Sequence, residues 1–396
     1  MKHGSLRPFL GAAAIAVAGL VIVAVASRTQ VEASSQAAQA GAAATDRVPL
    51  TDDVFKTVVL LRGLPVDTFF EAMGMFANAM GNDCTFCHSS KAYFDKRAFA
   101  EPTPRLQRAR QMIVMMNAIN KQYFGGQPRV TCFTCHQGSD RPVNDPNIQL
   151  QYATPVEDPN IRDIPIDTRL KADDIFDKYV EALGGRERLS KFTSFTARGT
   201  YAGFDTSFDK VPMELYARAP AQQTMIVHFF NGDSHRVFDG QSGWMAGPDT
   251  PLPILTLTAG NLDRVRLEAT AAFGTGLRQV FPEWRVGRTA IKDEEVIVVQ
   301  GMRNGRVLAN FYFDQTGLLV RMIRWTETPV GFVPTEIDYQ DYRDVAGVKI
   351  PFKRTVSQTY MQMNVELTSV QPNVQIPETR FARPLPGKPT DGRAAG

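Results

Sequence analysis

The sequence contains few of the residues that usually bind metals or form disulfides. Its 396 residues include only four cysteines and five histidines, against 25 prolines and 30 glycines. All four cysteines lie in two pentapeptides, Cys84-Thr85-Phe86-Cys87-His88 and Cys132-Phe133-Thr134-Cys135-His136. No thiol therefore remains for a structural disulfide elsewhere, or for a lipid attached through cysteine.

An excess of charge of one sign is also missing. The formal net charge is +3, from 44 Lys and Arg against 41 Asp and Glu. Such a balance produces no general attraction to nucleic acid or to an anionic membrane, so we expect no nucleic-acid partner. The length suggests two or three domains, and an apolar content of 43% is enough to give each of them a core.

One long hydrophobic run lies near the N-terminus. Lys2 and Arg7 precede residues 11–26, which carry no polar side chain and end in Ala24-Val25-Ala26. This order is typical of a secretory signal. The run is shorter than the roughly 20 residues that span a bilayer comfortably. We predict that residues 1–26 are a signal peptide, the alternative being an N-terminal anchor. The chain is then exported to the periplasm, and an anchor would tether it to the inner membrane.

A helix is expected before each pentapeptide. Apolar residues spaced by three and four run from Phe69 to Met80, and Gly81 follows where a left-handed cap ends a helix. Thr103-Pro104 has the cap and first-turn proline of a second helix, which ends at Gly125-Gly126. The repeated helix-then-motif pattern predicts one small helical domain over residues 48–141.

The remaining segments differ in composition. Residues 27–47 read as a flexible tether, 142–169 as a proline-rich linker, and 384–396 as a disordered tail. Residues 170–383 open with a helix over 172–183 and continue as short β-branched runs between turn signals. Examples are Gln223–Phe230 before Asn231-Gly232, Val296–Gln300, Asn310–Phe313 and Leu318–Trp325. The expected class is therefore α+β multidomain, with a helical domain followed by an antiparallel β-rich domain.

Both pentapeptides have the pattern Cys-x-x-Cys-His, which attaches haem c. Two cysteines at this spacing form thioether bonds to the haem vinyl groups, and the following histidine binds the iron. We predict two haems c, on Cys84, Cys87 and His88 and on Cys132, Cys135 and His136. The alternative is one zinc ion held by the four cysteines. That alternative does not explain why a histidine follows each pair, and export favours haem.

The sixth iron ligand decides what each haem does. Methionine closes the iron and raises its potential, which suits electron transfer, whereas an open iron suits catalysis. Six methionines lie on the two expected helices, and ordinary core packing accounts for most of them. They are Met73, Met75, Met80, Met112, Met115 and Met116. Spacing alone does not select one on each helix.

Residues 48–142 resemble a half-module of the cytochrome subunit of purple bacterial photosynthetic reaction centres. The resemblance rests on Ala109–Asn120 before Val130–His136, and on Phe69–Met73 before Cys84–His88. In that family each haem follows a helix that donates a methionine. The resemblance implies that Met112 and Met73 are the sixth ligands. The family has four haems in two pairs, whereas this chain has two motifs and a β-rich remainder.

The C-terminal domain resembles the LolA/LolB-like lipoprotein-carrier fold, an antiparallel half-barrel around helices. The residues that carry this likeness are Tyr179–Gly185 and Asp338–Pro351. We expect no catalytic constellation there. Core packing is the simpler interpretation of Trp244, Trp284 and Trp325, and a surface position that of His228 and His235, which flank a turn.

These features predict an electron-transfer protein rather than an enzyme. Its partners are expected to be redox proteins, including a membrane-bound complex, and donation to a photosynthetic reaction centre is one alternative. A second alternative is a peroxidase-like haem enzyme with one open iron. A third is an assembly or lipid-binding protein that acts through the C-terminal domain.

Overall fold

The computed structural model describes residues 47–153, 161–248 and 250–386. Contacts divide the chain into two units, Met1–Pro49 and Leu50–Gly396. The descriptions that follow concern the second unit.

The predicted signal peptide or anchor, nearly all of the tether and most of the C-terminal tail lie outside the described residues. Among the helices that are described, none is long and apolar enough to cross a membrane.

The part that carries the pentapeptides is helical. Its elements are α2 (Thr51–Val54), α3 (Val66–Met80), η1 (Cys84–Phe86), η2 (Ser90–Tyr93), η3 (Lys96–Ala100), α4 (Pro104–Tyr123), α5 (Cys132–His136) and α6 (Ile148–Tyr152). Both predicted helices are present. Helix α3 ends at Gly81, whose φ of 61° is left-handed, because glycine adopts this conformation without a steric penalty. The Thr103 hydroxyl caps α4 by accepting a hydrogen bond from the Leu106 N–H at 3.0 Å.

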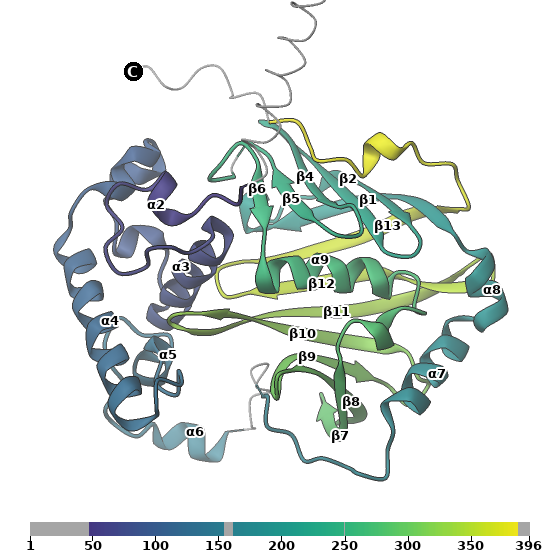
Figure 1. The fold of residues 1–396 in the computed structure, drawn as a ribbon, viewed down its shortest axis with the longest axis horizontal. Coiled ribbons are helices and arrows are strands. Elements are labelled where there is room, and N and C mark those ends of the chain that lie inside the picture. Colours follow the sequence, from purple (N-terminus) through teal and green to yellow (C-terminus); the bar gives the residue numbers. More distant parts are fainter. Residues whose placement is uncertain (1–46, 154–160, 249, 387–396) are drawn as a thin grey trace, which may run out of the picture. The chain divides into compact units, whose positions relative to one another are not determined.

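The second part is dominated by one open antiparallel sheet, with strand order β6-β5-β4-β3-β2-β1-β13-β12-β11-β10-β9-β8-β7 (Figure 1). The strands are β1 (Ser194–Gly203), β2 (Val211–Arg218), β3 (Gln222–Phe229), β4 (Gly232–Phe238), β5 (Gly243–Ala246), β6 (Leu255–Leu257), β7 (Glu283–Ile291), β8 (Glu294–Arg303), β9 (Arg306–Phe313), β10 (Leu319–Thr328), β11 (Gly331–Val345), β12 (Val348–Gln358) and β13 (Gln362–Pro372). The helices are α7 (Ala172–Leu183), α8 (Arg186–Lys191) and α9 (Ala259–Ala271), with η4 (Phe204–Thr206), η5 (Leu277–Gln279) and η6 (Glu378–Arg380). The predicted α+β class is confirmed. Helix α9 was not anticipated from the sequence.

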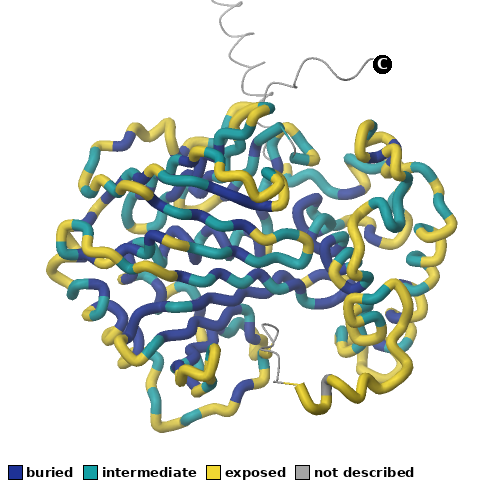
Figure 2. The backbone as a smooth tube through the Cα atoms, turned by 180° about the vertical axis from the view of Figure 1, so that it is seen from behind, coloured by how far each residue is buried: buried dark blue, intermediate teal, exposed yellow. Residues whose placement is uncertain are grey.

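The two faces of the sheet are covered differently. The large core packs α7 and α9 against one face, and Trp284 lies in it, 4.9 Å from the Phe176 ring. On the other face Ile164, from the predicted linker, packs with Trp325. Figure 2 shows the resulting buried segments along the central strands and the exposed ones in the loops. The two tryptophans therefore contribute to cores, as expected.

Helix α3 is attached to the sheet by buried polar groups, which we call the polar seam: Asp67 and Glu71 of α3, Thr258 and Asn261 at the start of α9, and Arg324 of β10. The Thr258 N–H and hydroxyl donate to Asp67 at 2.6 and 2.7 Å. Arg324 lies 3.7 Å from Glu71 and donates to Asn261 at 3.0 Å. Burial raises the pKa of Glu71 despite the attraction of Arg324, so its charge depends on that cation.

Replacing Arg324 by methionine should therefore lower the free energy of unfolding by about 3–5 kcal/mol, because the Glu71 carboxyl is left buried without its cation. Adding Glu71→Gln to Arg324→Met should restore part of the loss. Denaturant titration followed by far-ultraviolet circular dichroism measures both effects. Arg306→Met is the control, since Arg306 pairs with Glu327 at an exposed site and should cost about 1 kcal/mol or less. Equal losses in the single and double variants would contradict the assignment.

Candidate functional site

Both pentapeptides open onto one cavity, which we call the motif cavity. Its volume is about 1360 Å³, and its wall includes Cys84, Cys87, His88, Cys132, Cys135 and His136. This exceeds the roughly 300–1,000 Å³ of a pocket for one drug-sized ligand. The structure thus brings together all six residues predicted from the motifs, although the two motifs are 48 positions apart.

The two motif histidines are oriented in the same way. The Nδ1 of His88 lies 2.8 Å from the Phe99 carbonyl oxygen, and the Nδ1 of His136 lies 3.0 Å from the Ser139 carbonyl oxygen. A carbonyl only accepts, so Nδ1 carries the proton and Nε2 has a free lone pair. Histidines that bind metals usually donate their other ring N–H in this manner, which fixes tautomer and ring orientation.

The thiols are not arranged as zinc ligands. All four cysteines are described and free, and no group of three or more His, Cys, Asp or Glu side chains in the described part could hold a metal ion. Burial raises the pKa of Cys132 to about 11, and it also raises that of Cys87. A zinc ligand must be a thiolate, which burial disfavours, whereas a thioether carries no charge. The residues fit c-type haem better than zinc.

Helix α4 connects the two motifs. At its N-terminus the hydroxyl of Thr103 donates to the Cys87 carbonyl oxygen. Near its C-terminus the buried side chain of Asn120 donates to the Val130 carbonyl at 2.7 Å and accepts from the Val130 N–H at 2.9 Å. Val130 lies two residues before Cys132. One element of 20 residues, about 30 Å long, therefore positions both motifs.

The methionines separate by position. Met73 and Met80 of α3 line the motif cavity, as do Met112, Met115 and Met116 of α4. Met75 does not line it and is buried beside Val330 and Val333 of the β10–β11 hairpin, in a cluster that also contains Met116. Met73 and Met112 are thus on the cavity wall, together with other methionines.

The β-rich part supplies much of the cavity wall, which sequence reasoning missed. Apolar contributors include Met225, Phe229, Met245 and Met363. Charged and polar contributors are Arg236 of β4, Asn261 and Arg264 of α9, and Tyr360 in the β12–β13 turn. No motif marks these residues. The apolar alternation of their strands predicts a buried face, but not what that face adjoins.

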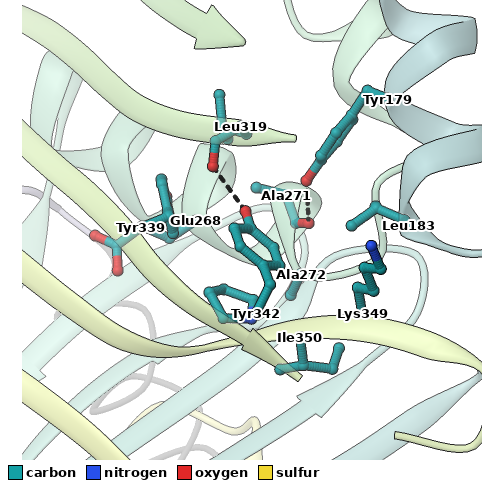
Figure 3. A pocket seen from close by; sticks show the side chains of 11 residues that line it. Tyr179, Leu183, Glu268, Ala271, Ala272, Leu319, Tyr339, Tyr342, Lys349 and Ile350 are labelled. Carbon is teal, nitrogen blue, oxygen red and sulfur yellow. Dashed lines mark hydrogen bonds between the residues drawn. The ribbon is translucent and has the colours of Figure 1, made fainter. Parts of the chain in front are cut away.

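A second cavity lies between α7, α9 and strands β10–β12 (Figure 3). Its volume is about 30 Å³, enough for about one water molecule. Tyr342 donates to the Leu319 carbonyl at 2.7 Å, and the Tyr339 hydroxyl has no protein partner among the described residues. This cavity is too small for a substrate. His228 lies apart from both cavities and pairs with Asp233 at 2.8 Å, as expected for a surface histidine.

The end of α3 packs against the loop that follows the second motif. The Gly138 N–H donates to the Ala79 carbonyl at 3.0 Å, and a Cβ on Gly81 would lie 2.1 Å from the Gly138 carbonyl oxygen. This close approach, together with the left-handed φ, requires glycine at position 81.

Gly81→Ala should therefore lower the free energy of unfolding by clearly more than Gly125→Ala. Gly125 has a similar φ of 60° but open space around it. Its variant should therefore lose only about 1–2 kcal/mol of unfolding free energy, from the strained backbone conformation. Denaturant titrations of the two variants isolate the contact between α3 and the second motif. If both variants lose the same free energy, the contact does not constrain the site.

Comparison with known proteins finds similar proteins for the first part of the chain. Residues 8–156 match the family model described as photosynthetic reaction centre cytochrome C subunit. Such a subunit from Roseobacter denitrificans is 30% identical over 95 residues, covering 20% of this chain and 25% of the relative. The subunit from Thermochromatium tepidum is 28% identical over 98 residues, covering 21% and 24%. This chain therefore spans about a quarter of the length of these relatives.

Solved structures align with the β-rich part. A LolA superfamily protein from Nitrosomonas europaea aligns with a TM-score of 0.37 and 10% identity, covering 54% of this chain and 98% of that one. A DUF1329 family protein from Desulfovibrio piger aligns with a TM-score of 0.37 and 8% identity, covering 53% and 96%. TM-scores this low carry no argument about function. The first part of the chain is thus similar to photosynthetic reaction centre cytochrome c subunits.

Proposed function

We propose that this protein is a di-haem c-type cytochrome that carries electrons between redox partners in the periplasm. The observation that carries the proposal is the shared orientation of His88 and His136. Each donates its Nδ1–H to a backbone carbonyl and lies on the wall of the cavity that also contains its cysteine pair. The match of residues 8–156 to a cytochrome c subunit model supports it.

Each motif would hold one haem. Cys84 and Cys87 form the thioether bonds of the first and Cys132 and Cys135 those of the second, with His88 and His136 as iron ligands. Bound haem supplies a one-electron redox centre, whose potential a methionine ligand raises. Met73 and Met112 are proposed as the sixth ligands, since they line the cavity and occupy the positions that the resemblance indicates.

Two haems in one cavity provide a short relay between partners. The curated relatives are named as reaction centre subunits, so donation of electrons to a photosynthetic reaction centre is the second candidate function. Electron exchange with another membrane-bound complex is the broader proposal, because this chain matches only a quarter of those relatives. An N-terminal anchor in place of a cleaved signal would keep the protein at the inner membrane.

The ligand assignment predicts a spectroscopic result. The oxidised protein should show the weak far-red charge-transfer band of His/Met-ligated haem. Met73→Ala and Met112→Ala should each remove the contribution of one haem, because each iron loses its sulfur ligand, and the double variant should show no band. The haem content of the purified holoprotein, measured as the pyridine haemochrome, should stay at two per chain, since the thioether bonds are untouched.

Met80→Leu and Met115→Leu are matched controls. Both residues line the same cavity on the same two helices, so their variants should keep the full band. Loss of the band in a control instead would move the ligand to that residue. High-spin iron at either motif in the unmodified protein would favour the peroxidase-like alternative, and absence of covalent haem would overturn the proposal.

A further inference from the structure

Two arginines of the β-rich part, Arg236 of β4 and Arg264 of α9, line the motif cavity. We infer that Arg264, supported by Arg236, binds a propionate of the haem attached at Cys84 and Cys87. The β-rich part then completes the haem site and sets the charge beside it. This inference rests on the proposed function.

Arg264 is a buried cation with an unused donor. Its side chain is 9% exposed, and its Nε donates to Glu268 at 2.8 Å. Its Nη2 has no hydrogen-bond partner among the described residues. A buried N–H without an acceptor costs about 1–3 kcal/mol, and more on a charged group. Such a group has a donor left for an acceptor that the polypeptide does not supply.

The charges are arranged so that the cations face the motif cavity. Arg236 donates to the other oxygen of Glu268, also at 2.8 Å, so one carboxylate serves two guanidinium groups. Glu268 does not line the motif cavity and is instead one of the residues that line the small cavity (Figure 3). The cluster of Arg236, Arg264 and Glu268 therefore carries a formal charge of +1, with its positive groups turned toward the motif cavity.

The carboxyl groups that line the same cavity nearby have partners of their own. Glu71 pairs with Arg324 at 3.7 Å. Asp67 accepts from Thr258 and Asn261. Asp205 accepts from the Tyr201 hydroxyl at 2.8 Å. Glu71 also attracts Arg264, but its ion pair with Arg324 balances its charge, so the Arg264 cluster keeps a formal charge of +1.

The proposed methionine ligand of the first haem lies on a helix that this region contacts. The β12–β13 turn packs on α3 at Gly74, where a Cβ would lie 2.6 Å from both Thr359 Oγ1 and Tyr360 Cδ1. Gly74 adjoins Met73, the proposed ligand of the first haem. Burial raises the pKa of Tyr360 to about 12, and the nearby charge of Arg264 opposes that rise. Tyr360 thus lies within electrostatic reach of Arg264 and beside the helix that carries Met73.

A haem propionate suits this site better than a hydrated anion does. The two propionates are the acidic groups of a haem, and a guanidinium binds a carboxylate through strong charge-assisted hydrogen bonds. The rest of the wall around Arg264 includes apolar side chains such as Met225 and Met363, which suit the porphyrin and not a hydrated ion. A cation beside the haem disfavours the more positive, oxidised state, so it raises the reduction potential.

The test is a redox titration of the holoprotein, in which the two haems are followed by their visible spectra. Arg264→Gln should lower the potential of one haem, shifting its reduction equilibrium by about tenfold, or 59 mV for one electron. Arg264→Lys keeps the charge and should stay close to the unmodified protein. Glu268→Gln removes the opposing carboxylate and should shift the same haem in the opposite direction, which a merely structural role would not do.

Arg266→Gln is the matched control. Arg266 lies on the same helix and pairs with Asp263 at 3.0 Å, but it does not line the cavity, so both potentials should be unchanged. If Arg264→Gln also leaves both potentials unchanged in a protein with two covalent haems, the inference is wrong and the proposed function stands. Should Arg264→Gln fail to fold, Arg264→Lys and Glu268→Gln decide. A chain without covalent haem would refute the proposed function itself.

Discussion

Helix α3 carries two carboxyl groups, Asp67 and Glu71, that are buried against the β-rich part. They stay buried because groups more than 180 residues further along the chain bind them: Thr258 and Asn261 hold Asp67, and Arg324 balances Glu71. An unpaired carboxylate at such a site would be costly, so these contacts allow α3 one position on the sheet. The rest of the site depends on that position, because α3 carries Met73 and ends at Gly81.

The position of α3 in turn affects the positions of both motifs. Gly81 contacts Gly138 after the second motif, and α4 connects the two motifs through Thr103 and Asn120. Two hairpin turns of the sheet also pack on α3. Tyr360 of the β12–β13 turn packs at Gly74, and Val330 of the β10–β11 turn packs with Met75. The β-rich part therefore helps to position the helices that carry the two motifs. The proposed propionate site at Arg264 follows from this shared wall.

The parts of the fold with strong local signals could be predicted. The caps at Gly81 and Thr103 delimit α3 and α4, and the β-branched runs correspond to β3, β8, β9 and β10. Helix α9 escaped prediction for a physical reason. Its buried face carries Asn261, Arg264 and Glu268, so burial and apolarity do not coincide along it. A search for apolar periodicity finds no helix where the buried side chains are charged.

The sequence alone was enough to predict haem attachment, because Cys-x-x-Cys-His places two thiols and an imidazole within five residues and needs no distant partner. It also identified the two helices that supply methionines. Only the tertiary structure decided that both motifs share one cavity, that the imidazoles are fixed by the carbonyls of Phe99 and Ser139, and that Arg264 faces the same space. Those relations depend on which charged groups are buried together, and the partners that stabilise these buried charges lie far apart in the chain.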